Sequence, residues 1–307
     1  MLLRRPILVA ARSKLLKNTI SAAPIARNVV HRFVAGETDD DAVRTTRELV
    51  DEGLHVSLDH LGEDTVDGGQ AEAATKAYLT LLSRLSEQGL TPAAEVSVKL
   101  SAVGQVLDEQ LALDNARAIC EAAAAVGTTV TLDMEDHTTT DSTLRVLHEL
   151  RRDFPQTGAV IQSYLRRSED DCRALATEGS RVRLCKGAYD EPESVAFREA
   201  ADVDRSYARC LGVLMAGPGY PMVATHDPKL VSLAGELVKE HHRTPDTCEY
   251  QMLYGVRPDE QRRLANEGQT VRVYVPYGHE WYGYLMRRLA ERPANVAFFL
   301  RAMATRS

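Results

Sequence analysis

The chain lacks several features that would place it in familiar classes of protein. No apolar run approaches the roughly 18–20 residues that a helix needs to cross a bilayer. Only five of the 307 residues are cysteine and no C-x-x-C pair occurs, which favours buried thiols in a reducing compartment over a disulfide framework. The net charge of −7 argues against general nucleic-acid binding, which needs a basic face. We therefore expect a cytoplasmic globular protein.

Common nucleotide-binding and catalytic motifs are also missing. No G-x-G-x-x-G follows the first predicted strand and no G-x-x-x-x-G-K-[ST] occurs, so neither a Rossmann site nor a P-loop is expected. H-E-x-x-H and G-x-S-x-G are absent. The pair His241-His242 does not have the spacing of metal ligands, and no metal site is predicted.

Acidic residues are absent from the first 36 positions, which carry several arginines and lysines. Such a segment fits a helical cap, a basic helix at the inner face of an anionic membrane, or a transit peptide. We favour a cap over residues 1–52, with helices at Ile7–Asn18, Ala23–Phe33 and Asp40–Asp51.

Short apolar runs of β type alternate with helix-like segments such as Asp114–Val126 and Asp141–Arg152. Strands that alternate with helices pair in parallel, and eight such units can close into a (β/α)8 barrel of TIM type, here over residues 53–292. A terminal helix is predicted over residues 293–307. The eight predicted strands are Leu54–Leu58, Glu95–Leu100, Thr129–Leu132, Gly158–Ile161, Arg181–Leu184, Pro221–Ala224, Cys248–Leu253 and Thr270–Val275.

Polar side chains lie in the last residues of most of these runs or just after them, and the carboxyl ends of barrel strands are where active sites form. In chain order they are Lys99, Asp133, Gln162, Tyr164, Arg183, Lys186, Thr225, His226 and Tyr274. Arg183 and Lys186 bracket a small-residue turn, which is typical of an anion site; the alternative is an ion pair with Asp190 or Glu191.

The helix after the last strand places Tyr284, Arg287 and Arg288 on one face. Two adjacent arginines can hold a carboxylate through forked hydrogen bonds. Beside Lys99 at the barrel mouth, this helix predicts a carboxylate substrate.

At this point the sequence resembles the proline dehydrogenase family, from Phe33 to Arg301. The most specific pieces, in the expected order, are SVKLS (Ser97–Ser101), LDMED (Leu132–Asp136), QSYL (Gln162–Leu165), RLCKGAY (Arg183–Tyr189), ATHD (Ala224–Asp227), YQMLYG (Tyr250–Gly255) and YLMRRLAE (Tyr284–Glu291). The resemblance implies a distorted (β/α)8 barrel that holds FAD at the carboxyl ends of its strands. No DNA-binding segment or aldehyde dehydrogenase domain is recognised, so the chain resembles the monofunctional form.

The resemblance also implies individual roles. Lys99, Arg287 and Arg288 would bind the proline carboxylate, Asp133 would balance and orient these cations, and Tyr274 and Tyr284 would pack on the ring. Arg183 would lie near flavin N5, Tyr164 and Tyr189 would flank the flavin and substrate, and Glu63 would act as a gate. The remaining cofactor contacts would be Met134, Gln162, Lys186, Gly187, Ala188, Thr225, His226 and Glu291. In this chain Cys185 stands where Val is common in the family.

The implied reaction is hydride transfer from proline C5 to flavin N5, giving Δ1-pyrroline-5-carboxylate in the first step of proline degradation. A membrane quinone would accept the electrons, and a separate pyrroline-5-carboxylate dehydrogenase would take the product. Two alternatives remain from the residues themselves. One is a Schiff-base aldolase using Lys99 or Lys186, and the other is a barrel that only binds a phosphate ligand.

Overall fold

The computed structural model describes residues 30–62 and 65–291, and eight strands and nine helices lie wholly within that part of the chain. The strands are β1 (His55–His60), β2 (Ala94–Val98), β3 (Val130–Leu132), β4 (Ala159–Gln162), β5 (Arg181–Cys185), β6 (Tyr220–Ala224), β7 (Glu249–Leu253) and β8 (Val271–Tyr277). The helices are α4 (Asp39–Asp51), α5 (Gly68–Glu87), α6 (Glu109–Ala125), α7 (Thr140–Arg151), α8 (Ser168–Leu175), α9 (Ala200–Ala216), α10 (Pro228–Glu240), α11 (Pro258–Asn266) and α12 (Trp281–Glu291).

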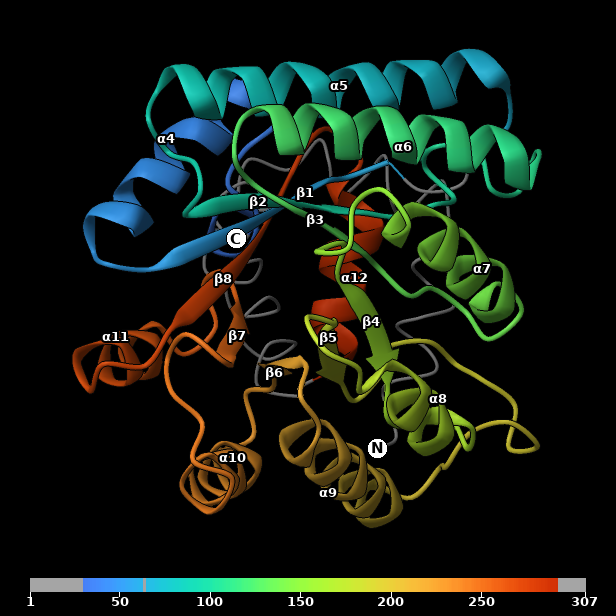
Figure 1. Cartoon of the computed structure of the whole chain (residues 1–307). Helices are drawn as coiled ribbons and strands as arrows, with labels where there is room; N and C mark the ends of the chain where they lie inside the picture. Colours follow the sequence, from blue (N-terminus) through green and yellow to red (C-terminus); the bar gives the residue numbers. More distant parts are fainter. Residues whose placement is uncertain (1–29, 63–64, 292–307) are drawn as a thin grey trace, which may run out of the picture.

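All strand pairs are parallel, in the order β3-β2-β1-β8-β7-β6-β5-β4, and helices surround the sheet (Figure 1). The first strand pairs along its whole length with the last, from His55 opposite Arg272 to His60 opposite Tyr277. Between β3 and β4 there is only one isolated bridge, Thr131 with Gly158. The sheet is therefore a nearly closed barrel, which confirms the predicted fold class.

Each predicted strand is present, and no boundary differs by more than two residues. The third predicted helix is α4, which begins at Asp39 after Thr38 forms a capping box with Asp41. α6 begins five residues before its prediction, because the side chain of Asp108 caps the helix by accepting from the backbone N–H of Leu111. The predicted helices Ile7–Asn18 and 293–307 lie outside the described residues. Of the predicted helix Ala23–Phe33 only residues 30–33 are described, and they are helical. The division into cap, barrel and terminal helix stays a prediction.

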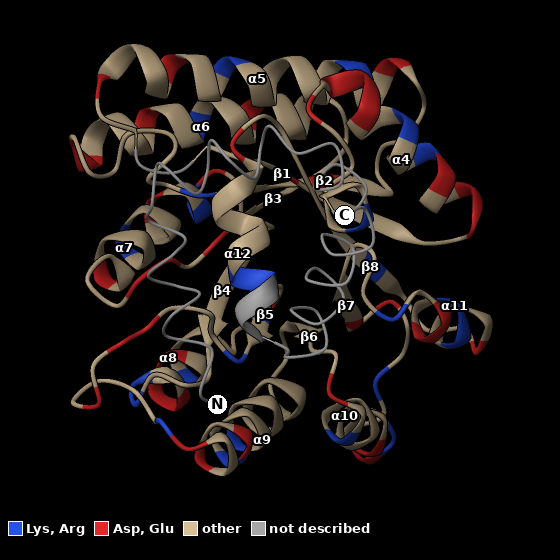
Figure 2. Ribbon diagram, turned by 180° about the vertical axis from the view of Figure 1, so that it is seen from behind, with Lys and Arg blue, Asp and Glu red and all other residues tan. Residues whose placement is uncertain are grey.

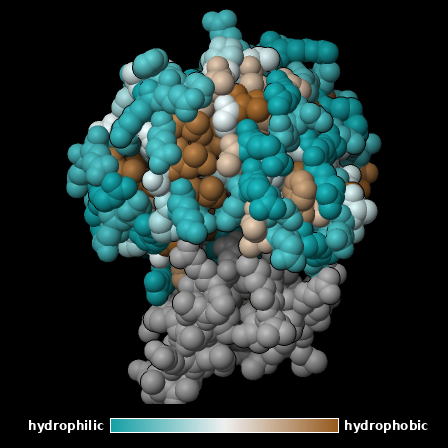
Figure 3. Space-filling model, turned by 90° about the horizontal axis from the view of Figure 1, so that it is seen from below, coloured by the Kyte–Doolittle hydropathy of each residue, from teal (hydrophilic) through white to brown (hydrophobic). Residues whose placement is uncertain are grey.

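The outer helices bury one face against the barrel. On α5 the residues Tyr78, Leu81, Leu82 and Leu85 are all buried, and their spacing is that of one helical face. Figure 3 looks onto the side formed by α8, α9 and α10, where hydrophilic residues cover most of the surface and apolar patches lie between them. No helix in the described part of the chain is long and apolar enough to cross a membrane.

The barrel interior is ionic, whereas such interiors are usually filled with branched apolar side chains. Near the amino ends of the strands, Arg181 lies 2.6 Å from Glu95 and Arg272 lies 2.9 Å from Glu249, and all four residues are buried. Buried charges persist when they are paired and hydrogen-bonded. These pairs form the floor below the residues that the sequence places at the strand ends.

Candidate active site

A cavity of about 610 Å³ opens at the carboxyl ends of the strands. Figure 2 looks onto this end, where α12 lies across the barrel. The volume is in the range of small-molecule and cofactor sites. The predicted site residues that line it are Lys99, Asp133, Met134, Gln162, Arg183, Lys186, Gly187, Ala188, Tyr189, Thr225, His226, Tyr274, Tyr284, Arg287 and Arg288.

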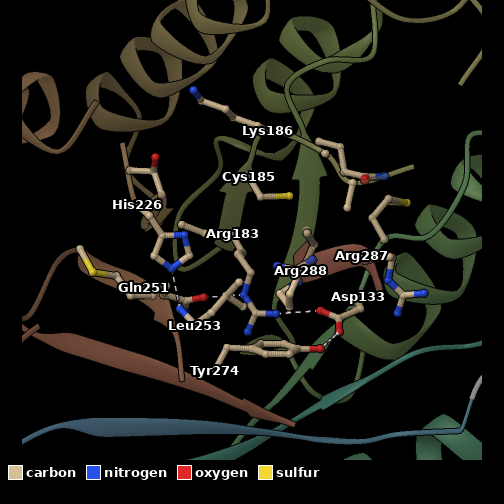
Figure 4. Close-up of a pocket in the computed structure, with 18 of the residues that line it drawn as sticks. Asp133, Arg183, Cys185, Lys186, His226, Gln251, Leu253, Tyr274, Arg287 and Arg288 are labelled. Atoms are coloured by element: carbon tan, nitrogen blue, oxygen red, sulfur yellow. Dashed lines mark hydrogen bonds and ion pairs between the residues drawn. The ribbon is translucent and has the colours of Figure 1, made fainter. Parts of the chain in front are cut away.

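Asp133 is the centre of the hydrogen-bond network in this cavity (Figure 4). Its Oδ1 accepts from Arg183 Nη1 at 2.7 Å and from Ser97 Oγ at 2.8 Å. Its Oδ2 accepts from the Tyr274 hydroxyl at 2.6 Å and lies 3.6 Å from Lys99 Nζ. One carboxylate therefore links Ser97 of β2, Arg183 of β5, Tyr274 of β8 and Lys99, which follows β2.

Lys99 has a nearer partner that sequence reasoning missed. Its Nζ lies 2.5 Å from Asp59 Oδ2, and Asp59 is completely buried at the end of β1. Asp133 is therefore the more distant of two carboxylates on Lys99, and the arginine that it binds is Arg183. The predicted first strand ended at Leu58. The real strand continues to His60, and Asp59 follows Ser57 on the inward face.

The pKa values of these two carboxyl groups are shifted in opposite directions. Burial raises the pKa of Asp59 above its ordinary value, against the opposing effect of Lys99. Burial also acts on Asp133, but Lys99 and Arg183 outweigh it and hold the Asp133 pKa below its ordinary value. Burial, with help from both carboxylates, raises the pKa of Tyr274 well above its usual range, so Tyr274 remains a hydrogen-bond donor.

Arg183 is fixed on every side inside the barrel. Besides Asp133, it donates from Nε to Gln251 Oε1 at 2.5 Å and from Nη2 to Ser57 Oγ at 3.1 Å. The Gln251 amide in turn donates from Nε2 to Glu249 Oε1 at 2.5 Å. Gln251 also lines the cavity. The sequence motif YQMLYG contained this residue, but glutamine alone does not indicate a role, so it was not predicted.

The last described helix contributes the predicted aromatic and cationic face. Tyr284, Arg287 and Arg288 all line the cavity, and Arg288 lies with its guanidinium carbon 5.0 Å from the centre of the Tyr284 ring. Tyr284 and Arg288 are buried. The three residues that the sequence spacing puts on one face of this helix therefore all line the cavity.

Lys186 lies apart from the Asp133 cluster in Figure 4. Its Nζ is 2.5 Å from Asp204 Oδ1 and 2.9 Å from Asp227 Oδ2. Partial burial lowers its pKa, but these two carboxylates raise it above the ordinary value. The alternative that Lys186 or Arg183 pairs with Asp190 or Glu191 is wrong. The two cations also do not converge on one point, because Arg183 points into the barrel.

Gly187 has φ +108°, a conformation that side chains rarely allow. A Cβ there would lie 2.3 Å from ring carbons of Tyr164. Tyr164 is buried behind Gly187 and is not among the lining residues, and its expected place beside the bound molecules stays a prediction.

His226 and Gln162 also have defined orientations. The backbone N–H of Leu253 donates to His226 Nε2 at 2.8 Å, which places the imidazole proton on Nδ1. Gln162 Nε2 donates to the carbonyl of Glu135 at 2.7 Å, which fixes its amide at the cavity wall. Glu63 lies outside the described residues, and Glu291 ends α12 with a side chain that also lies outside them.

Comparisons with known proteins agree with this geometry. The family model for proline dehydrogenase matches residues 42–301. The chain belongs to the proline dehydrogenase family. Proline dehydrogenase 1 of Bacillus subtilis is 39% identical over 272 residues, which is 89% of each chain. Proline dehydrogenase of Deinococcus radiodurans is 41% identical over 281 residues, or 90% of each chain. The resemblance seen in the sequence, and the enzyme class, are confirmed.

A solved structure gives the same fold. Proline utilization A from Bdellovibrio bacteriovorus, inactivated by N-propargylglycine, superposes with a TM-score of 0.81 at 24% identity. The match covers 92% of this chain and 34% of that larger one. At this level of identity it supports the barrel fold alone.

Proposed function

We propose that this proline dehydrogenase works with FAD and passes the electrons to a membrane quinone. As a member of its family, the enzyme oxidises proline to Δ1-pyrroline-5-carboxylate. The single observation that carries the proposed mechanism is the cavity that joins a cationic end, at Lys99 and the α12 arginines, to a wall of small and polar residues near Lys186.

The wall residues fit the cofactor. Gly187 and Ala188 allow close approach of a planar ring system, because neither carries a bulky side chain. Gln162, Thr225 and His226 present polar groups with fixed orientation, and Lys186 and Arg183 supply positive charge. FAD, when bound, supplies the hydride acceptor for the reaction. Met134 and Tyr189 would complete its surroundings.

The protein's own contribution is positioning. Lys99, Arg287 and Arg288 would bind the substrate carboxylate at one end of the cavity, through charge-assisted hydrogen bonds. Tyr284 and Tyr274 would enclose the ring, and Asp133 keeps Tyr274 and Arg183 in place. Oxidation removes a hydride from C5 and a proton from the ring nitrogen, so the amine must be neutral. We assign the nitrogen proton to solvent at the cavity mouth.

A Schiff-base aldolase is less compatible with the site. Such an enzyme needs an unprotonated lysine amine. Lys99 contacts two carboxylates and Lys186 contacts another two, and both arrangements stabilise the ammonium form.

The cofactor is tested by a spectrum of the purified protein. We expect yellow protein that carries about one flavin per chain. The visible flavin absorption should be lost when L-proline is added in the absence of oxygen. D-proline serves as the control, because a carboxylate on the opposite face cannot reach the same cations with C5 in place. Colourless protein that does not take up added FAD would contradict the proposal.

Substrate choice is expected to depend on Tyr274. A tyrosine against the ring leaves no hydrogen-bond partner for a 4-hydroxyl, and an unpaired buried hydroxyl costs about 1–3 kcal/mol. The enzyme should therefore prefer proline to trans-4-hydroxyproline. Tyr274→Ser should narrow the ratio of the two kcat/KM values, mostly through loss of proline efficiency. Tyr274→Phe, which keeps the ring, should preserve the preference, and an unchanged ratio in the serine variant would reject this pose.

The role of the basic N-terminal segment is tested by removing residues 1–20, and we expect it to be a folded cap. If the basic segment is a folded cap, the truncated enzyme should lose thermal stability and still have its flavin reduced by proline. If the segment contacts membrane, stability should stay the same while turnover with quinone in anionic liposomes falls. Neutral liposomes with the same quinone provide the control, because they cannot attract basic residues.

A further inference from the structure

Three loops on one side of the cavity meet at the weakest place in the barrel. Strands β3 and β4 share one bridge, and their backbone hydrogen bonds are Leu132 N–H to Gly158 O at 2.9 Å and Gly158 N–H to Val130 O at 2.8 Å. Beyond these contacts no strand pairing holds the loops after β3 and β4 together. These two loops and the loop after β5 carry much of the expected cofactor wall.

The carboxylate of Glu191 contacts all three loops. Glu191 lies in the loop after β5, and its Oε1 accepts from the backbone N–H of His137 at 2.9 Å. The same oxygen accepts from the Tyr164 hydroxyl at 3.2 Å, and Oε2 is bonded to His137 Nδ1. His137 follows β3 and Tyr164 follows β4. The Glu191 side chain is polar but the residue is only 4% exposed, so these donors replace the water that it has lost.

Tyr164 transmits this arrangement to the cavity. Its ring lies against Gly187, and its backbone N–H donates to the carbonyl of Lys186 at 3.0 Å. Gly187 lines the cavity, whereas Tyr164 and Glu191 do not. A shift of the Tyr164 ring would therefore move Gly187, because there is no free space between them.

We propose that Glu191 is a positioning residue that joins the loops after β3, β4 and β5 and so holds the Gly187 wall in the shape that FAD requires. The inference rests on the proposed use of FAD. It assigns to Glu191, His137 and Tyr164 a role in cofactor binding without direct contact. The carboxylate-binding residues Lys99, Arg287 and Arg288 lie outside this cluster, so their function should be affected less.

Three variants separate this role from a general effect on folding. Glu191→Ala removes all the acceptors, and Glu191→Gln keeps an amide oxygen for His137 and Tyr164. Asp190→Asn is the matched control, because it weakens an exposed ion pair with Arg198 on the same loop. Loss of a hydrogen bond to a charged group typically changes an equilibrium constant by more than about tenfold. We expect the FAD dissociation constant to rise at least about tenfold in Glu191→Ala, and less than about threefold in the other two variants.

The spectrum of bound flavin gives a readout beyond affinity. Visible circular dichroism and midpoint potential of the flavin should move toward those of free FAD in Glu191→Ala and recover in Glu191→Gln. The KM for proline should change less than the FAD dissociation constant. Unchanged FAD affinity and flavin dichroism in Glu191→Ala would overturn the inference.

Hydrogen exchange tests, without relying on FAD, whether Glu191 holds the loops after β3, β4 and β5 together. We call this set of contacts the junction. Amides in residues 133–139 and 186–190 should exchange faster in Glu191→Ala than in wild type and in Asp190→Asn. If Glu191→Ala does not fold, Tyr164→Phe removes one of the bonds, keeps the ring, and should still speed exchange at 186–190. Equal exchange in wild type and variant would reject the junction. Wild type that binds no FAD but passes the exchange test would refute the proposed cofactor and leave the junction standing.

Discussion

Asp133→Ala is expected to reduce kcat/KM for proline by at least about 100-fold. Removing one partner of a buried ion pair leaves the remaining charge buried and uncompensated, so the groups around it rearrange. Here the removal would leave Arg183 without its nearest carboxylate and Tyr274 without its acceptor. The side chains at the substrate end would then lose their fixed positions. Stopped-flow reduction by proline measures the effect on the chemical step.

The same substitution should affect stability less than activity. Arg183 keeps its bonds to Gln251 and Ser57, and Lys99 keeps Asp59, so much of the buried network survives. Asp133→Asn should retain the fold and part of the hydrogen bonding. Asp153→Ala is a suitable control, because its ion pair with Arg117 is exposed on the surface. If Asp133→Ala simply unfolds, Asp133 has a structural role and the assignment to catalysis fails.

The sequence predicted the fold well because each strand is a short apolar run with clear ends. In a parallel barrel these ends all lie at one face, so Lys99, Asp133, Arg183 and Tyr274 could be grouped although they are far apart in the chain. Their individual partners could not be predicted, because side-chain pairing depends on strand register. Ser57 lies opposite Tyr274 and Asp59 opposite Ser97, and no local pattern indicates either pairing.

Two differences from prediction have a common physical cause. Lys186 was expected to serve an anion, and it contacts carboxylates from α9 and from the loop after β6. Tyr164 was expected to flank the flavin and substrate, and the sequence did not indicate that its ring lies against Gly187. In both cases the residue lies just after a strand, but its side chain contacts residues outside that strand and its turn: Asp204 and Asp227 for Lys186, and Gly187 for Tyr164. Sequence spacing gives the position of a residue along the barrel more readily than its partners.

Arg287→Met and Arg288→Met are each expected to lower kcat/KM for proline by at least about tenfold, with FAD retained. A hydrogen bond to a charged group is worth about 1.5–3 kcal/mol, and methionine keeps an unbranched apolar stem but removes the guanidinium and its charge. Both arginines lie on α12 at the cavity. Binding that is equally strong in the ground and transition states appears in KM, so the loss should be largest there. Arg262→Met, on exposed α11, is the control.

Measuring wild type and each arginine variant with both proline and prolinamide separates carboxylate recognition from any general disturbance of α12. Prolinamide has the same ring but no carboxylate charge, so wild type should use it poorly. If the arginines bind the carboxylate, each methionine variant should lose much less efficiency with prolinamide than with proline. The difference between the two losses is the coupling energy between the side chain and the carboxylate. Equal losses with both substrates would mean that α12 was displaced, and that the carboxylate is bound elsewhere, with Lys99 as the next residue to test.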